Sequence, residues 1–219
     1  MNQILELLEK GKKLRVIRKM QSDLTGIISD HEVYDHKESD VHMVSEKKQA
    51  DVCMISADGN LTDCLHLAAE LEGPLILETC FHKVFRYGLS AFAADLQKAG
   101  ISAVRVPDLP YEERGQLAVY LLDSEAPFLI SEITPASGDR IMAITRYARG
   151  VVWCLGRGIP EKLRELPGDP LEYYLYAVDA ACPIPYLLDL PGRTEDELAA
   201  YADGAEGAAG YAILHRNLE

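Results

Sequence analysis

The sequence lacks the features that mark exported, membrane-spanning and nucleic-acid-binding proteins. Its longest apolar runs have the length of a β-strand and are broken by charge, so none is long enough for a transmembrane helix. Basic residues are too few to attract polyanions, because 22 Lys and Arg stand against 35 Asp and Glu and the net charge is −13. The five cysteines form no CxxC pair, which is typical of free thiols in a reducing compartment. The sequence predicts a cytoplasmic protein with neither nucleic acid nor membrane as a partner.

The remaining composition is that of an ordinary globular protein. The chain has 219 residues, of which 48% are apolar and 26% charged, enough for one sizeable core. Its start, MNQILELLEKGKKLRVIRK, is amphipathic and predicts a helix over residues 2–19 instead of an export signal. The basic cluster of residues 10–19 is expected on that helix.

Strand-like runs alternate with helical patterns along the chain. We expect helices at 61–72, 89–98, 111–123, 139–148, 170–181 and 194–203, with Gly100, Pro110 and Gly150 near their ends and a capping box from Thr194 to Glu197. Eight strands are expected, at 24–29, 51–56, 74–79, 103–106, 127–131, 151–155, 185–188 and 208–214. This alternation predicts an α/β protein whose eight parallel strands close into a single (β/α)8 TIM-barrel domain over residues 1–219.

Two places depart from a regular barrel. Residues 30–46 are too charged and too weakly periodic for a full outer helix, so the first outer helix is expected to be degenerate. The sequence given stops five residues after the eighth expected strand, where a last outer helix would follow. The expected barrel is therefore truncated after strand eight, with strand surface that the first helix or a second subunit, as in a homo-dimer, would cover.

Three segments resemble one known family, the alpha subunit of tryptophan synthase. The stretch that ends at Glu113, VFRYGLSAFAADLQKAGISAVRVPDLPYEE, is similar to the family's helix with a phenylalanine, its AG pair and its V-P-D-L-P turn. Residues 133–157 and 185–214 are similar to later parts of the same family. The resemblance implies a TIM barrel without a cofactor or metal of its own, beside a beta subunit that uses pyridoxal phosphate. It also implies cleavage of indole-3-glycerol phosphate to indole and glyceraldehyde 3-phosphate.

The residues that the family uses for proton transfer differ here. The family has a glutamate in the pattern A-D-x-x-E-x-G, whereas this chain has Met54 at that position, and a methionine transfers no proton. The resemblance leaves Asp58 or Asp63 for the aspartate that follows in the family.

The family's phosphate-binding glycines also differ. Asp189, Leu190 and a proline without an N–H replace a Gly-Phe-Gly turn, and Gly210 with Tyr211 replaces a Gly-Ser pair. The family's mobile loop after the sixth strand is short here and carries Arg157, which is either an anion ligand or a solvated charge. Trp153 stands where the family has a tyrosine.

Charged residues take strand positions that the family leaves apolar. By the resemblance, Glu78 and Arg105 occupy neighbouring strands and face the substrate. Because an unpaired buried charge is costly, we expect them to form a salt bridge. They either fill the space of the lost substrate or form a new site in which Glu78 is the acid or base, with Glu132 as a third member.

Weaker patterns leave other chemistry open. His31, His36 and His42 have no spacing that shares a helical face, so a metal site is less favoured than a solvated loop. Cys80 and His82 are either a nucleophilic pair or structural.

Three functions therefore stay open. The chain is an alpha-type lyase, a catalytically degenerate partner of a pyridoxal-phosphate beta subunit, or an enzyme with a site rebuilt for a non-phosphorylated substrate.

Overall fold

A computed structural model describes residues 2–22, 24, 49–123 and 126–214. The chain divides into two compact units, one that runs from the N-terminus to Leu129 and one from Ile130 to Ile213. The expected degenerate helix at 30–46, residues 25–29 of the first expected strand and the histidines at 31, 36 and 42 lie outside the described residues.

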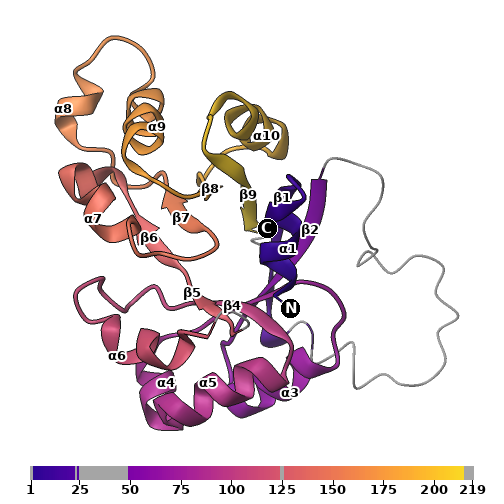
Figure 1. Ribbon diagram of the computed structural model, residues 1–219. Helices are drawn as coiled ribbons and strands as arrows, with labels where there is room; N and C mark the ends of the chain where they lie inside the picture. The colour runs from indigo at the N-terminus through magenta and orange to yellow at the C-terminus, as the bar shows by residue number, and fades with distance from the viewer. Residues whose placement is uncertain (1, 23, 25–48, 124–125, 215–219) are drawn as a thin grey trace, which may run out of the picture. The chain divides into compact units, whose positions relative to one another are not determined.

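The first unit is a parallel sheet with helices between its strands (Figure 1). The strand order is β5-β4-β3-β2-β1. Its strands are β1 (Lys13–Met20), β2 (Gln49–Ser56), β3 (Leu75–Glu78), β4 (Ile101–Arg105) and β5 (Phe128–Leu129). Its helices are α1 (Gln3–Glu9), α3 (Leu61–Ala69), α4 (Phe81–Tyr87), α5 (Leu89–Lys98), α6 (Gly115–Ala118) and the 3-10 turn η1 (Val119–Leu121).

The N-terminal segment corrects the expected helix over residues 2–19. Helix α1 ends at Glu9, and Gly11 follows with a φ of 65°, a left-handed conformation that glycine adopts without strain. From Lys13 the chain extends as β1, in which Leu14 and Val16 are buried on one face. The basic cluster of residues 10–19 therefore lies mostly on a strand that pairs with β2.

The sheet of the first unit is buried on both faces. One face packs on the helices, where Ile55, Leu75 and Leu77 join Phe92 and Leu96 in a single apolar cluster. Alternation along the strands turns the other residues away from these helices. That second face carries Val16, Arg18, Val52, Met54, Ser56, Ile76, Glu78, Ala103 and Arg105.

The second unit is also a parallel sheet, in the order β6-β7-β8-β9. Its strands are β6 (Ser131–Ile133), β7 (Val152–Leu155), β8 (Tyr186–Asp189) and β9 (Ala208–Leu214). Its helices are η2 (Pro135–Arg140), α7 (Ile141–Thr145), α8 (Glu161–Arg164), α9 (Pro170–Ala181) and α10 (Glu195–Gly204). No helix in the described ranges is long and apolar enough to cross a membrane.

Several expected boundaries were wrong. The expected strand at 127–131 is two short strands, β5 and β6, and β1 was not expected as a strand, so the described part of the chain has nine strands. The expected helix at 139–148 shortens to α7, and residues 139 and 140 belong to η2, in which Gly138 has a φ of 48°. The expected helix at 111–123 shortens to α6 and η1, and helices α4 and α8 were not expected. The helices at 89–98 and 170–181 and the strand at 208–214 are confirmed.

Asp169 caps helix α9 and links it to α10. Its carboxylate accepts hydrogen bonds from the Leu171 N–H at 2.9 Å and the Tyr201 hydroxyl at 2.6 Å. The Tyr201 hydrogen bond, then that of Leu171, and the charge of Arg193 lower the pKa of Asp169, against a smaller opposing effect of burial.

We expect Asp169→Ala to lower the free energy of unfolding by about 1 kcal/mol at neutral pH, the usual value of an N-cap. Because the folded-state pKa lies below the unfolded value, this stabilisation is present above the unfolded pKa. It disappears as the pH falls through the folded pKa. Urea unfolding at neutral and at acid pH measures this, and a difference that persists in acid would contradict the assignment.

Candidate functional site

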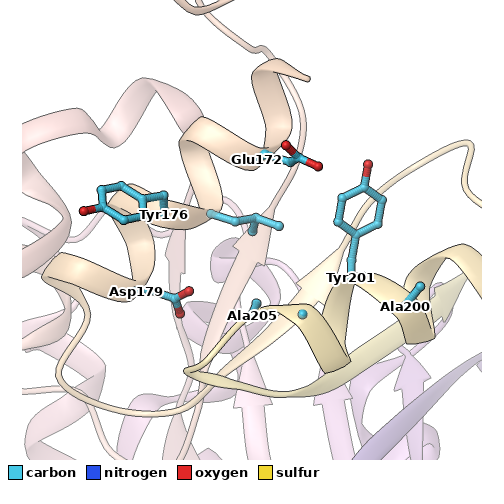
Figure 2. A pocket seen from close by; sticks show the side chains of 8 residues that line it. Glu172, Tyr176, Asp179, Ala200, Tyr201 and Ala205 are labelled. Carbon is cyan, nitrogen blue, oxygen red and sulfur yellow. The ribbon is translucent and has the colours of Figure 1, made fainter. Parts of the chain in front are cut away.

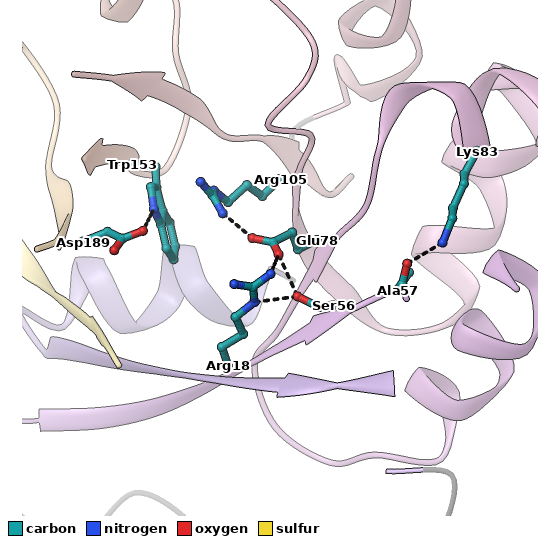
Figure 3. A network of polar contacts seen from close by, with 8 residues as sticks. All are labelled: Arg18, Ser56, Ala57, Glu78, Lys83, Arg105, Trp153 and Asp189. Carbon is teal, nitrogen blue, oxygen red and sulfur yellow. Dashed lines mark hydrogen bonds and ion pairs between the residues drawn. The ribbon is translucent and has the colours of Figure 1, made fainter. Parts of the chain in front are cut away.

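Glu78, the last residue of β3, is the centre of a buried polar network (Figure 3). Its Oε2 forms an ion pair with Nη1 of Arg105, which confirms the expected contact. Its Oε1 forms a second ion pair with Nη2 of Arg18 and accepts a hydrogen bond from the Ser56 hydroxyl at 2.7 Å. Nε of Arg18 also donates to the Ser56 hydroxyl at 2.7 Å. We call Arg18, Ser56, Glu78 and Arg105 the Glu78 network.

Strand register places the four side chains together. Ser56, Glu78 and Arg105 are the last residues of β2, β3 and β4, and each is the direct cross-strand partner of the next. Arg18 comes from β1, two residues before its end. The carboxyl ends of four adjacent parallel strands thus supply one cluster, which is where parallel α/β folds bind ligands.

Within the Glu78 network, two guanidinium groups pair with one carboxylate. Only 8% of the side-chain surface of Arg105 and of Glu78 is exposed, whereas 31% of Arg18 is. Charges buried to this degree require pairing, because desolvation of an unpaired ion costs several kcal/mol. The network is therefore a fixed polar site with one arginine that solvent reaches.

Sequence reasoning missed Arg18 and Ser56. The signal for Arg18 is the alternation of Leu14, Val16 and Arg18, which has the period of a strand and not of a helix. Ser56 was inside an expected strand but carries no charge that would single it out.

Met54 lies on the same face of β2 as Ser56 and is fully buried. It is the direct cross-strand partner of Arg18 on β1 and of Ile76 on β3. A thioether exchanges no proton, so this position adds apolar surface to the network and no acid or base.

The structure does not bring Asp58 or Asp63 into the Glu78 network. Asp58 is exposed and accepts hydrogen bonds from the backbone and hydroxyl of Ser22 at 3.3 and 2.8 Å. Burial acts to raise the pKa of Asp58, but hydrogen bonds from Ser22 and the backbone together lower it. Lys83 fixes this loop by donating to the carbonyl oxygens of Ala57 and Gly59. Asp63 lies on the exposed first turn of α3.

Trp153 and Asp189 form a separate polar pair inside the second unit. Nε1 of Trp153 on β7 donates to Oδ2 of Asp189 on β8 at 2.9 Å, and both side chains are buried. The buried carboxylate of Asp189 therefore has an indole N–H as a partner, and its relation to a phosphate ligand stays a prediction.

The other expected site residues of the second unit are dispersed. Tyr211 is buried on β9 beside Gly210, and its hydroxyl donates to Glu195 at 3.4 Å. Arg157 is exposed in the loop after β7, and Glu132 is half-buried on β6. The expected role of these four residues in substrate binding stays a prediction.

Cys80 and His82 lie at the start of α4. His82 is exposed on the first turn, two residues after the N-cap Cys80, and the choice between a nucleophilic pair and a structural role stays open. Asp108 of the V-P-D-L-P turn accepts a hydrogen bond from the Phe81 N–H at 2.8 Å and so fixes the start of α4. Burial raises the pKa of the thiols of Cys64 and Cys154 to about 12, which leaves both protonated at neutral pH. Within the described ranges, no three His, Cys, Asp or Glu side chains gather as a metal site would require.

Comparison with known proteins points to one family. The family profile "Tryptophan synthase alpha chain" matches residues 48–215. The tryptophan synthase alpha chain of Lachnospira eligens is 30% identical over 142 residues, 64% of this chain and 53% of that protein. That of Caldanaerobacter subterraneus is 31% identical over 148 residues, 65% and 55% of the two chains. This chain spans about half the length of the curated relatives it matches.

Solved structures give the fold. A tryptophan synthase alpha chain from Legionella pneumophila has a TM-score of 0.71 at 19% identity, over 98% of this chain and 85% of that chain. A chain of the tryptophan synthase α2β2 complex of Pyrococcus furiosus has a TM-score of 0.66 at 14% identity, over 92% and 87%. These likenesses confirm the expected α/β TIM-barrel fold class. The expected truncation after strand eight stays a prediction.

Proposed function

Since the chain belongs to the tryptophan synthase alpha chain family, we propose that it is a divergent member that binds a small anion at the Glu78 network and does not cleave indole-3-glycerol phosphate. The observation that carries this proposal is the double ion pair of Glu78 with Arg18 and Arg105. Met54, in place of the family's catalytic glutamate, supports the loss of the lyase.

The network does not suit an indole ring. An indole that displaced the contacts of Glu78 would leave buried charges without partners, at a cost of about 3 to 5 kcal/mol. An indole that left the contacts intact would meet charged groups where the family has apolar side chains.

The network does suit an anion. Two guanidinium groups belong to it, and a planar guanidinium binds carboxylate or phosphate oxygens in pairs. Arg18 is the group that a ligand reaches first, because 31% of its side chain is exposed. Glu78 would then lie beside the bound anion as the acid or base of a rebuilt site.

Two measurements on the purified full chain test the proposal. With indole-3-glycerol phosphate, we expect no indole above the buffer control, with or without a beta subunit. Calorimetric titration with inorganic phosphate and with succinate separates a phosphate ligand from a carboxylate ligand. Arg18→Gln should weaken the binding of whichever anion binds about tenfold.

Arg15 supplies the matched control. It lies on the same strand, its side chain is 32% exposed, and it pairs with Asp51. Arg15→Gln should leave anion binding unchanged. Indole release, or anion binding that Arg18→Gln leaves intact, would contradict the proposal.

A second function, as partner of a beta subunit, is favoured by exposed apolar side chains of the first unit. Phe85 on α4 is 64% exposed and Leu122 after η1 is 73% exposed. The Pyrococcus furiosus neighbour was solved as an α2β2 complex. Size-exclusion chromatography with and without a pyridoxal-phosphate beta subunit distinguishes a mixed complex, a homo-dimer and a monomer. Because Phe85 is one of these exposed apolar side chains, we expect Phe85→Asp to abolish the mixed complex.

A further inference from the structure

Helices α9 and α10 of the second unit enclose a groove of about 450 Å³, a size typical of small-molecule sites (Figure 2). Glu172, Leu175 and Asp179 line it from α9. Ala200, Tyr201 and Gly204 line it from α10. The small residues of α10 leave the space open, since a Cβ added at Gly204 would meet no atom within 4 Å.

The groove has two anionic ends and an apolar middle. Glu172 and Asp179 are seven residues apart, so they share one face of α9 and are separated by about 10 Å along its axis. Leu175, three residues after Glu172 and four before Asp179, shares their face of α9, and Tyr201 lines the groove from α10. A ligand that fits has a positive charge at each end and an apolar chain between.

The negative charge of the groove is not compensated by its own helices. Neither α9 nor α10 contains a Lys, Arg or His, whereas the two helices together carry Glu172, Asp179, Glu195, Asp196, Glu197 and Asp203. Of these acids, Glu197 pairs with Arg193, which precedes α10, at 3.4 Å. Surface helices usually pair acidic with basic residues one turn apart. The described partners of Asp179 are neutral donors, namely the Tyr186 hydroxyl and the N–H groups of Glu206 and Gly207. Its charge is thus oriented without being neutralised.

The aromatic wall is rigid and already accepts a cation. The Tyr201 hydroxyl donates to Asp169, which fixes the ring. The guanidinium of Arg193 lies 5.4 Å from the ring centroid, although Arg193 is not among the residues that line the groove. An ammonium group in the groove would meet the same ring and the carboxylates of α9.

We propose that the groove between α9 and α10 binds a linear organic diamine, with one ammonium group at Glu172, the other at Asp179 and the methylene chain on Leu175 and the small residues of α10. This site lies outside the Glu78 network and does not depend on the function proposed for that network.

Calorimetric titration of the full chain at low ionic strength tests the proposal with four probes. Octamethylenediamine has a length that spans both carboxylates, tetramethylenediamine is shorter, octylamine has one charge and octanediol has none. We expect octamethylenediamine to bind about fivefold tighter than octylamine or tetramethylenediamine, the usual contribution of a second exposed ion pair. Binding should weaken as salt is added.

Variants locate the site. Glu172→Gln should remove the advantage of the long diamine over octylamine, and Gly204→Leu should weaken all amines because its side chain fills the groove. Asp203→Asn is the matched control, since Asp203 is an exposed acid of α10 that does not line the groove. Equal affinity for octamethylenediamine and octylamine, no heat from any amine, or equal losses in Glu172→Gln and Asp203→Asn would overturn the proposal. Each variant is checked for native circular dichroism.

Discussion

Glu78→Leu is expected to lower the free energy of unfolding by about 4 kcal/mol, because it leaves two guanidinium groups beside each other without their carboxylate. The unpaired charge of Arg105 accounts for most of this cost, since only 8% of its side chain is exposed to solvent. The Ser56 hydroxyl also loses its acceptor. Urea unfolding followed by circular dichroism measures the loss.

Substitution of either arginine should lower the free energy of unfolding by less than substitution of Glu78 does. Arg105→Leu leaves Glu78 with Arg18 and Ser56, so we expect a loss of about 2 kcal/mol, that of a hydrogen bond to a charged group. Arg18→Leu removes a partly exposed side chain and should cost about 1 kcal/mol. The double variant Glu78→Leu with Arg105→Leu removes both buried charges and should be more stable than Glu78→Leu alone.

Glu72→Gln is the control for this series, since Glu72 is exposed between α3 and β3 and should change stability by less than about 0.5 kcal/mol. Equal losses for Glu78→Leu and Arg18→Leu would mean that Glu78 is not the centre of the network. A double variant less stable than Glu78→Leu would mean that packing, and not charge, holds this face of the sheet.

The sequence allowed the fold to be predicted because most strands are short apolar runs between helices with clear ends. The helix at 89–98 has apolar residues at helical spacing and Gly100 after it, so local signals and packing agree. Prediction was wrong at the N-terminus, because the LRVI run is apolar enough to extend a helical pattern. The alternation of Leu14, Val16 and Arg18 indicates a strand over too few residues to decide, and the pairing with β2 decides it.

Strand pairing, which local sequence does not show, also decides which residues of the candidate site could be predicted. Glu78 and Arg105 were expected to pair because the family resemblance places both inside the barrel on neighbouring strands, and an unpaired buried charge is costly. Arg18 and Ser56 depend on the parallel pairing of β1 with β2 and β2 with β3, and such pairings join residues far apart in sequence. The groove between α9 and α10 was not predicted, since periodicity shows which face of a helix is polar and not which helix lies opposite.

Buried polar side chains on the strands have partners in both units. In the first unit a glutamate and two arginines satisfy one another, while in the second unit Asp189 accepts from an indole N–H. A buried charge is tolerated only with its partner, so substitutions within each of these pairs are expected to be coupled.

Trp153→Phe is expected to lower the free energy of unfolding by about 3 kcal/mol, because it leaves the buried Asp189 carboxylate without the indole N–H. Asp189→Leu removes the charge and leaves the N–H without this acceptor, for a loss of about 2 kcal/mol. The double variant has neither polar group, so its loss should be smaller than the sum of the two single losses by at least about 1 kcal/mol.

Urea unfolding followed by far-ultraviolet circular dichroism reports all three variants without the tryptophan signal. Tyr176→Phe is the control, since Tyr176 is 78% exposed and removal of its hydroxyl should cost less than about 0.5 kcal/mol. Additive losses for Trp153→Phe and Asp189→Leu would mean that the 2.9 Å contact contributes little and that Asp189 is stabilised by other groups.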